Sequence, residues 1–270
     1  MILYTEHKIR VRSRTAGILS ICIPLSLAAL LLCTAAGSVS IPVGDTVRVL
    51  LRLLTGQAVP AGTASAIIAG IRLPRVLNVF LSGMCLSLSG AAMQGLLKNP
   101  LADGSTLGVS SGAGLGAVLA LSFGIGSSGG LGVTGLAMLT ALGSIALILL
   151  ISRGLDRSLT THTVILTGVV FSMLINALIS LIVTFSGEKA KNYLFWTMGS
   201  LSGTTYRDAL IQLLALLLFG GYLLSSCREL DAFAMGEANA RSIGVDVTGC
   251  RRRILIAVSC LTGVSVSIGR

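Results

Sequence analysis

Seven apolar stretches, most of them about 20 residues long, are the feature that most limits what this chain can fold into. A helix needs roughly 20 apolar residues to cross the hydrocarbon core of a bilayer. Of the 270 residues, 53% are hydrophobic and 11% are charged, which leaves too little polar surface for a water-soluble domain. The sequence therefore predicts an all-α, polytopic bundle of membrane-spanning helices. The predicted spans are 16–36, 74–96, 103–123, 131–152, 163–186, 208–226 and 254–269.

The positively charged residues predict the orientation of the chain in the membrane. Cytoplasmic loops are enriched in Lys and Arg, and a cytoplasmic N-terminus places most of these residues inside. The first apolar stretch follows the basic residues Lys8, Arg10, Arg12 and Arg14. A signal peptide begins in the same way, but here the apolar part is too long and no small-residue cleavage site clearly follows. We therefore expect a multi-pass protein with a cytoplasmic N-terminus and a retained first helix.

The segment KNPLADGSTLGVSSGAGLGA, residues 98–117, combines a polar turn with glycines at every fourth position. Pro100 disfavours helical geometry at Asn99, so one helix is expected to end here and the next to begin near Asp103 or Ser105. Small residues four apart lie on one side of a helix and are the usual contact surface between membrane helices. We expect close helix packing, with lining of a substrate path as the alternative. The glycines are Gly104, Gly108, Gly112 and Gly116.

The fifth predicted span carries a line of polar side chains. Ser172, Asn176, Ser180 and Thr184 recur at intervals of four and fall on one slowly turning side of the helix. A polar line in lipid needs hydrogen-bond partners or water. Two interpretations remain open from these residues alone, namely hydrogen bonds to neighbouring helices and a surface that faces a translocation path.

Residues 228–253 form the longest polar interval on the predicted cytoplasmic side. Its centre mixes apolar residues with charged residues and glycine, which is typical of one or two short helices lying across a membrane surface. A helix of this kind can fit into a groove on a partner protein. A solvated loop whose arginines only set the topology is the alternative.

Several function classes find no support in the sequence. The six cysteines show no C-x-x-C pair, so neither a zinc site nor a disulfide framework is expected. The phosphate-loop motif G-x-x-x-x-G-K-[ST] does not occur, and the two histidines, His7 and His162, belong to no catalytic pattern. The net charge of +10 is scattered along the chain, unlike a nucleic-acid-binding patch. We therefore expect no enzyme activity, no catalytic residue, no cofactor, no metal and no nucleic acid.

Four segments together resemble the permease subunits of iron-siderophore, haem and cobalamin ATP-binding-cassette (ABC) importers, the FecCD type. They are IRLPRVL at 71–77, SGAAMQGLLKNPLADGSTLGVSSGAGLGA at 89–117, FWTMGSLSG at 195–203 and MGEANARSIGV at 235–245. The resemblance covers the chain from about residue 15 to its end. It implies that residues 1–270 form a single transmembrane permease domain of a ten-span fold, with a cytoplasmic coupling segment at about 228–253.

The resemblance also implies partners and a location. Such a permease works in the bacterial cytoplasmic (inner) membrane with two cytoplasmic ABC ATPase subunits, an extracytoplasmic solute-binding protein and a second permease copy, identical or paralogous. The chain would carry an iron chelate, most naturally a ferric siderophore, with haem and cobalamin as the other options. ATP hydrolysis would belong to the partner subunits.

Individual residues take expected roles from the same resemblance. Arg72 and Arg75 match positions that dock the binding protein, which would explain two arginines on the predicted outer side. Ser172, Asn176 and Ser180 match the family's path-lining helix. The residues expected in the ATPase groove are Gly236, Glu237, Ala240, Arg241 and Gly244.

The chain also departs from the family pattern. Family members continue into three further helices, whereas this sequence stops at Arg270 after about seven of ten spans. We therefore expect a C-terminally incomplete permease. The alternative hypothesis is a non-transporting membrane remnant that still binds the ATPase through residues 228–253.

Overall fold

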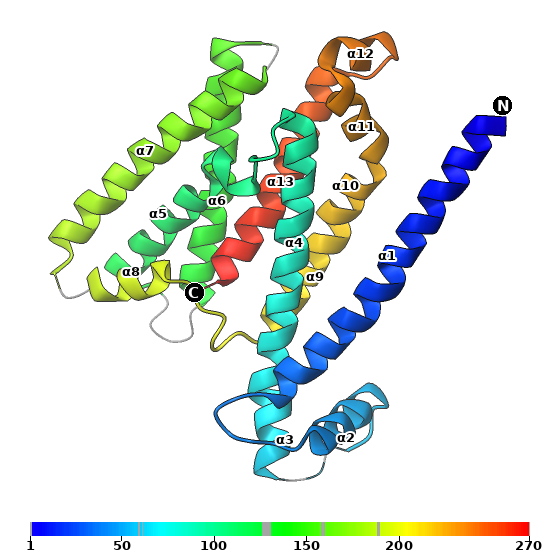
Figure 1. The fold of residues 1–270 in the computed structure, drawn as a ribbon. Coiled ribbons are helices and arrows are strands. Elements are labelled where there is room, and N and C mark those ends of the chain that lie inside the picture. Colours follow the sequence, from blue (N-terminus) through cyan, green and yellow to red (C-terminus); the bar gives the residue numbers. More distant parts are fainter. Residues whose placement is uncertain are drawn as a thin grey trace. The chain divides into compact units, whose positions relative to one another are not determined.

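The computed structural model describes residues 2–58, 60, 62–125, 131–157, 160–187 and 190–269. The regular structure in these ranges is helical and contains no strand, which confirms the predicted all-α bundle. The chain divides into two compact units, residues 1–80 and 81–270. Helix α4 (Leu73–Leu97) begins in the first unit and ends in the second (Figure 1).

The described residues of the first unit form three helices ahead of α4. They are α1 (Ile2–Ala35), α2 (Val43–Leu54) and α3 (Thr63–Ile67), and the π-helical turn η1 (Ile68–Arg72) joins α3 to α4. Helix α2, which the apolar stretches did not predict, has Asp45 in its first turn and Arg52 in its last, so both charges complement the helix dipole. Ile41, Val49 and Ile68 form the small core of this unit.

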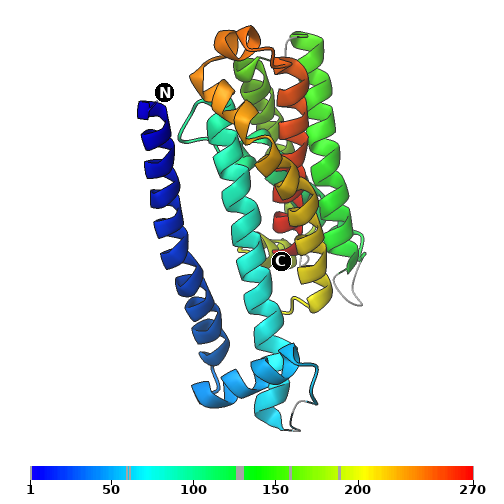
Figure 2. The same ribbon diagram turned by 90° about the vertical axis from the view of Figure 1, so that its right-hand side faces the viewer.

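The second unit is a bundle around α13 (Val247–Ile268). Helix α13 packs against α5 (Val109–Ser122), α6 (Leu131–Leu155) and α9 (Tyr206–Ala215), and both views place it inside this unit (Figures 1 and 2). The other elements are η2 (Gly104–Leu107), α7 (Thr161–Phe185), α8 (Ala190–Thr197), η4 (Leu216–Gly220), α10 (Gly221–Ser225), α11 (Cys227–Met235) and α12 (Glu237–Ser242).

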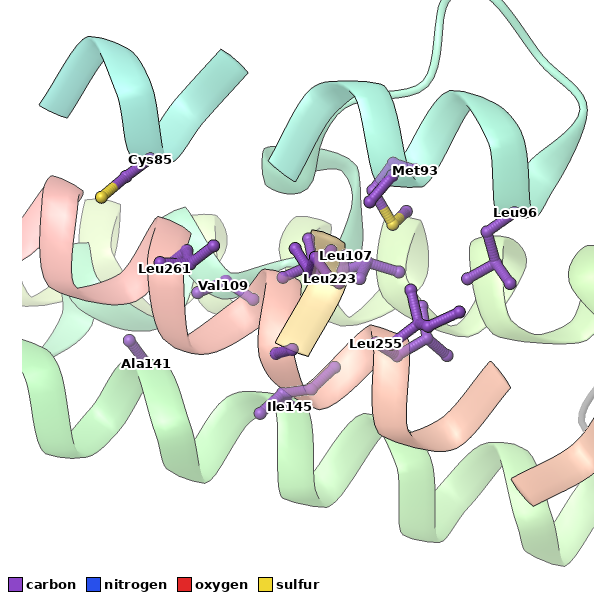
Figure 3. Packing of buried hydrophobic residues seen from close by; sticks show 14 of the residues in the cluster. Cys85, Met93, Leu96, Leu107, Val109, Ala141, Ile145, Leu223, Leu255 and Leu261 are labelled. Atoms are coloured by element: carbon purple, nitrogen blue, oxygen red, sulfur yellow. The ribbon is translucent and has the colours of Figure 1, made fainter. Parts of the chain in front are cut away.

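Apolar side chains bury α13 on two sides. Figure 3 shows Leu255 and Leu261 of α13 between Met93 of α4 and Ala141 of α6. Each of these four side chains is fully buried. Small residues such as Ala141 bring α6 close to α13, which increases van der Waals contact where lipid supplies no hydrophobic drive between helices.

Five described helices are long and apolar enough to cross a membrane, and each overlaps one of the predicted spans, although the second begins well before the predicted residue 74. They are Ala16–Ala35, Thr63–Leu97, Gly132–Leu155, His162–Phe185 and Tyr206–Ser225. The predicted span 103–123 is wrong at its start, because the chain first forms the 3-10 turn η2 and α5 begins only at Val109. With 14 residues, α5 is about 21 Å long and is shorter than the hydrocarbon core.

Helix α13 begins earlier than the predicted span 254–269. Its first turns contain Arg251, Arg252 and Arg253, and Asp246 caps its N-terminus by accepting a hydrogen bond from the backbone N–H of Gly249 at 3.0 Å. The apolar stretch therefore predicted only the later part of this helix. The basic residues before it belong to the same helix.

Candidate functional site

Two of the four spaced glycines bring α5 against α6. A Cβ atom added to Gly116 would lie 2.6 Å from the carbonyl oxygen of Leu136 and 2.8 Å from the Cα of Ala137. A Cβ atom on Gly112 would lie 2.7 Å from the Cβ of Ser144. These separations are shorter than carbon and oxygen atoms tolerate, and for Gly116 both neighbours are backbone atoms. Only glycine fits at these two points without a shift of the helices.

The other two glycines do not continue the same face. Gly108 has a φ of 73° and ends the turn before α5, because glycine adopts the left-handed region without steric cost. An added Cβ there would lie 3.0 Å from the hydroxyl of Ser172 on α7. Gly104 lies in η2 beside Thr262 and Ser89. The expectation of one continuous glycine face is therefore wrong, and the four glycines contact different helices.

The polar line of the fifth span lies at the edge of the exposed side of α7. Ser172 is half-buried, whereas Asn176 and Ser180 are exposed. The hydroxyl of Ser172 donates to the carbonyl of Gly168 at 2.8 Å, and that of Ser180 donates to the carbonyl of Asn176 at 2.9 Å. Because these donors are satisfied within their own helix, this side of α7 can face a path or a neighbour without an unpaired hydroxyl group.

The opposite side of α7 is fixed by apolar packing. Ile175 and Ile179 are buried and form a cluster with Val118 of α5. This cluster sets the rotation of α7 about its axis. Asn176 and Ser180 consequently point away from the core of the second unit.

The two arginines of the RLPR motif have different environments in the first unit. Arg72 is buried, and its guanidinium donates hydrogen bonds to the carbonyl oxygens of Thr34 at 3.3 Å, Ala35 at 2.5 Å and Val39. These carbonyls lie at or just beyond the C-terminus of α1, where helical acceptors lack partners and where a positive charge is favourable. Arg75 is exposed. Arg72 therefore caps α1, while the guanidinium of Arg75 remains accessible.

The polar interval after α10 forms two short helices, α11 and α12, separated by Gly236 (Figure 1). Gly236 has a φ of 126° and Gly244, after α12, has a φ of 88°. The N–H of Gly244 donates to the carbonyl of Arg241 at 3.0 Å, which ends α12 in the manner of a glycine C-cap. Glycine is thus required on both sides of α12, and a side chain at either position would strain the backbone.

Helix α12 has one packed side and one exposed side. Ala240 is fully buried in the core cluster of the second unit. Arg241 is exposed, and Ile243 just after the helix is 65% exposed. An exposed arginine beside an exposed isoleucine is the composition of a surface that a partner protein can cover.

A buried ion pair that the sequence did not predict connects α12 to α13. The guanidinium of Arg251 pairs with the carboxylate of Glu237; the Arg251 side chain is 1% exposed and that of Glu237 is 36% exposed. The guanidinium carbon of Arg251 also lies 5.8 Å from the ring centroid of Phe233 on α11. The sequence left two interpretations of residues 228–253 open, a partner-binding segment and a loop whose arginines set the topology. Neither indicated this pair, because a pairing of residues 14 positions apart leaves no periodic signal.

The cysteines of the described residues are all free. Cys250, ahead of the predicted span of α13, is buried, and burial raises the pKa of its thiol. The negative charge of Glu229 raises that pKa further. The thiol is therefore neutral and unreactive at physiological pH. Within the described ranges, moreover, no group of three or more His, Cys, Asp or Glu could hold a metal ion.

Comparisons with known proteins agree with the arrangement of these elements. Residues 25–269 match the FecCD transport family. An uncharacterized ABC transporter permease protein, YvrB of Bacillus subtilis, is 39% identical over 236 residues, which cover 86% of this chain and 67% of that protein. The cobalamin import system permease protein BtuC of Halobacterium salinarum is 35% identical over 205 residues, covering 76% of this chain and 55% of that protein.

A solved structure has the same fold. It is an inward-facing conformation of an ABC transporter assigned to the metal-chelate type, with a TM-score of 0.76 and 27% sequence identity. The match covers 94% of this chain and 75% of the solved chain. The chain thus spans between about half and three quarters of the length of these proteins.

Proposed function

We propose that this chain, which belongs to the FecCD transport family, is the membrane-spanning permease subunit of an ABC importer. The observation that carries the proposal is the family match over residues 25–269, which includes the glycine-bounded helix α12. In this proposal the permease has no catalytic residue, and partner ATPase subunits hydrolyse ATP. The N-terminus lies in the cytoplasm, and α11 and α12 lie on the same side.

The ATPase subunits bind the exposed side of α12. Arg241 and Ile243 contribute the contacts, while Gly236 and Gly244 supply the turns that present the helix. Glu237 is also expected at this surface, and its carboxylate pairs in addition with Arg251 of the same chain. Ala240 packs inward and holds the helix on the bundle.

The Glu237–Arg251 pair transmits movement from α12 to the bundle. A partner that displaces α12 also displaces the N-terminal turns of α13, because the guanidinium of Arg251 is buried and its separation from the carboxylate would leave that charge unpaired. Helix α13 packs on α5, α6 and α9. ATP binding and hydrolysis in the partner would thereby rock these helices and open one side of the path at a time.

The translocation path is formed with a second permease copy, identical or paralogous, and Ser172, Asn176 and Ser180 of α7 face it. Support comes from the exposure of Asn176 and Ser180, from the half-buried position of Ser172 at the edge of the same side, and from hydroxyl donors that are already satisfied. An uncharged, hydroxyl-lined surface suits a large ligand that is held mainly by the binding protein.

The extracytoplasmic binding protein docks near Arg75. An exposed arginine at the edge of an interface steers a partner that carries carboxylates and raises the association rate more than the affinity. Arg72 contributes indirectly, by fixing the end of α1 beside this position.

The substrate class is a metal chelate of the ferric siderophore or cobalamin type. We place a ferric siderophore first for the breadth of the family and cobalamin second, because the relative from Halobacterium salinarum is a cobalamin permease. To test the proposal, the full chain would be reconstituted with its ATPase and binding protein. ATP hydrolysis would be measured with the binding protein empty or loaded with ferric siderophore, haem or cobalamin.

Stimulation by one loaded binding protein identifies the substrate. Association with the ATPase but no stimulation by any of the three ligands would contradict the importer proposal. Variant G244V, which strains the turn after α12, serves as the uncoupled control because valine disfavours a φ of 88°.

A further inference from the structure

A groove of about 570 Å³ lies between the C-terminal end of α6 and the N-terminal end of α13, two helices that run side by side in the second unit (Figures 1 and 2). One wall is a single face of α6 and the residues just after it, and the other is the first turns of α13. The lining residues are Ala146, Leu149, Leu150, Arg153, Arg157, Asp246, Thr248, Gly249 and Arg252.

One end of the groove is strongly basic. The side chains of Arg153, Arg157 and Arg252 are exposed, and across the described ranges none of them forms a hydrogen bond or an ion pair. Asp246 is the acidic residue of the lining, and its carboxylate is engaged as the N-cap of α13. Three positive charges against one negative charge leave a net charge of +2 in the groove.

The other end of the groove is apolar. Ala146, Leu149 and Leu150 precede Arg153 on the same face of α6, at helical spacings of three and four residues. From Ala146 to Arg153 the helix rises by about 10 Å. In the proposed topology the arginines lie at the cytoplasmic surface, and the apolar residues lie deeper in the bilayer.

We propose that this groove binds an anionic phospholipid. Its phosphate lies among the guanidinium groups of Arg153, Arg157 and Arg252, which form charge-assisted hydrogen bonds to phosphate oxygens. One acyl chain runs along Ala146 and Leu150. The combination of a basic end and an apolar end fits a lipid better than a free phosphate or an acidic protein surface, neither of which would use the apolar wall.

The site rests on the membrane topology of the proposed function and goes beyond that function. A lipid in this position would bridge α6 and α13, the helix that Arg251 connects to α12. The lipid composition of the cytoplasmic leaflet could thereby adjust how firmly α13 is held.

Native mass spectrometry of the delipidated full chain in a neutral detergent tests the proposal. The chain would be titrated with phosphatidylglycerol, phosphatidylcholine and glycerol phosphate. We expect tight binding of phosphatidylglycerol and much weaker binding of the other two. Each arginine near an anionic lipid contributes about 1 kcal/mol to binding. Variant R153Q/R252Q should therefore weaken phosphatidylglycerol binding roughly thirty-fold.

Variant R228Q/R253Q is the matched control, because it removes two exposed arginines that do not line the groove. It should leave the affinity nearly unchanged, and lipid-free thermal unfolding of both variants would show that they fold. Equal binding of both phospholipids, equal losses in both variants, or binding of glycerol phosphate as tight as that of the lipid would each overturn the proposal. The proposal would also be overturned if the ATPase, and not phosphatidylglycerol, protected the groove from chemical labelling. That result would show that the groove binds a protein partner. None of these results depends on transport.

Discussion

The buried guanidinium of Arg251 on α13 pairs with the carboxylate of Glu237, the first residue of α12. This contact joins a short helix with an exposed side to the central helix of the bundle. A buried ion pair is weak evidence for net stability, but it fixes geometry, because removal of either partner leaves the other without its counter-charge. The pair therefore explains how a contact on α12 can be felt by α5, α6 and α9.

The two partners of this ion pair should differ in the cost of their removal. In E237A a guanidinium that is 1% exposed loses its carboxylate, and we expect a loss of about 3 kcal/mol in the free energy of unfolding. In R251M the remaining carboxylate is already 36% exposed and can reach water, so we expect a loss of about 1 kcal/mol. Thermal unfolding in detergent would compare the variants, with the exposed R253M as control. A larger loss in R251M than in E237A would contradict this account of the pair.

Substitution of Arg72 should affect the stability of the chain, whereas substitution of Arg75 should affect docking of the binding protein. R72Q removes charged hydrogen bonds to the end of α1, so we expect a loss of about 2 kcal/mol in stability. R75Q should leave the unfolding temperature unchanged and slow the association of the binding protein, with an effect that fades as salt concentration rises. Surface-based binding kinetics at two ionic strengths would measure this. A loss of stability in R75Q equal to that in R72Q would refute the assignment.

The close contact of α5 with α6 predicts opposite effects for two Gly→Ala substitutions. G116A places a Cβ 2.6 Å from a backbone oxygen of α6, so the helices must separate and we expect a loss of about 2 kcal/mol. G143A on α6 has no atom within 4 Å of the added Cβ and should gain up to about 1 kcal/mol from helix propensity. Thermal unfolding of both variants provides the comparison. Equal stability of the two variants would show that the contact does not limit packing.

Accessibility of introduced cysteines should distinguish the polar part of the exposed surface of α7 from its apolar part. In a chain without its native cysteines, N176C and S180C should react with a membrane-impermeant maleimide when the complex is assembled in liposomes. V170C and L174C are exposed on the apolar side of the same helix and should remain unlabelled in lipid. Labelling would be quantified by mass spectrometry. Similar labelling of all four positions would remove the support for a path along Asn176 and Ser180.

The sequence predicted the parts of the fold that depend on local pattern. Apolar stretches of sufficient length identified the five long helices, because length and hydrophobicity are what a bilayer requires. The start of α5 was missed, since the left-handed conformation of Gly108 interrupts a pattern that otherwise resembles a continuous helix. Helix α2 was missed because it is amphipathic and too short to span.

The contacts that define the candidate site depend on residues far apart in the chain. Gly236 and Gly244 follow from the short-range pattern, since each provides a turn next to α12. The hydrogen-bond partners of Arg72 lie at least 33 positions away in the sequence, and the partner of Arg251 lies 14 positions away. No periodic pattern connects either arginine to its partner. The sequence therefore suggested a docking role for Arg72 and a topological role for the arginines near Arg251. It gave no sign of the hydrogen bonds that both arginines form.

Accumulation of radiolabelled substrate inside proteoliposomes tests the central claim most directly. The full chain would be reconstituted with its ATPase and with binding protein loaded with the ligand that stimulates hydrolysis. We predict uptake against a gradient with ATP, and none with a non-hydrolysable analogue or with the G244V variant. Uptake that is independent of ATP, or no uptake from a complex that binds both partners and hydrolyses ATP, would contradict an importer permease.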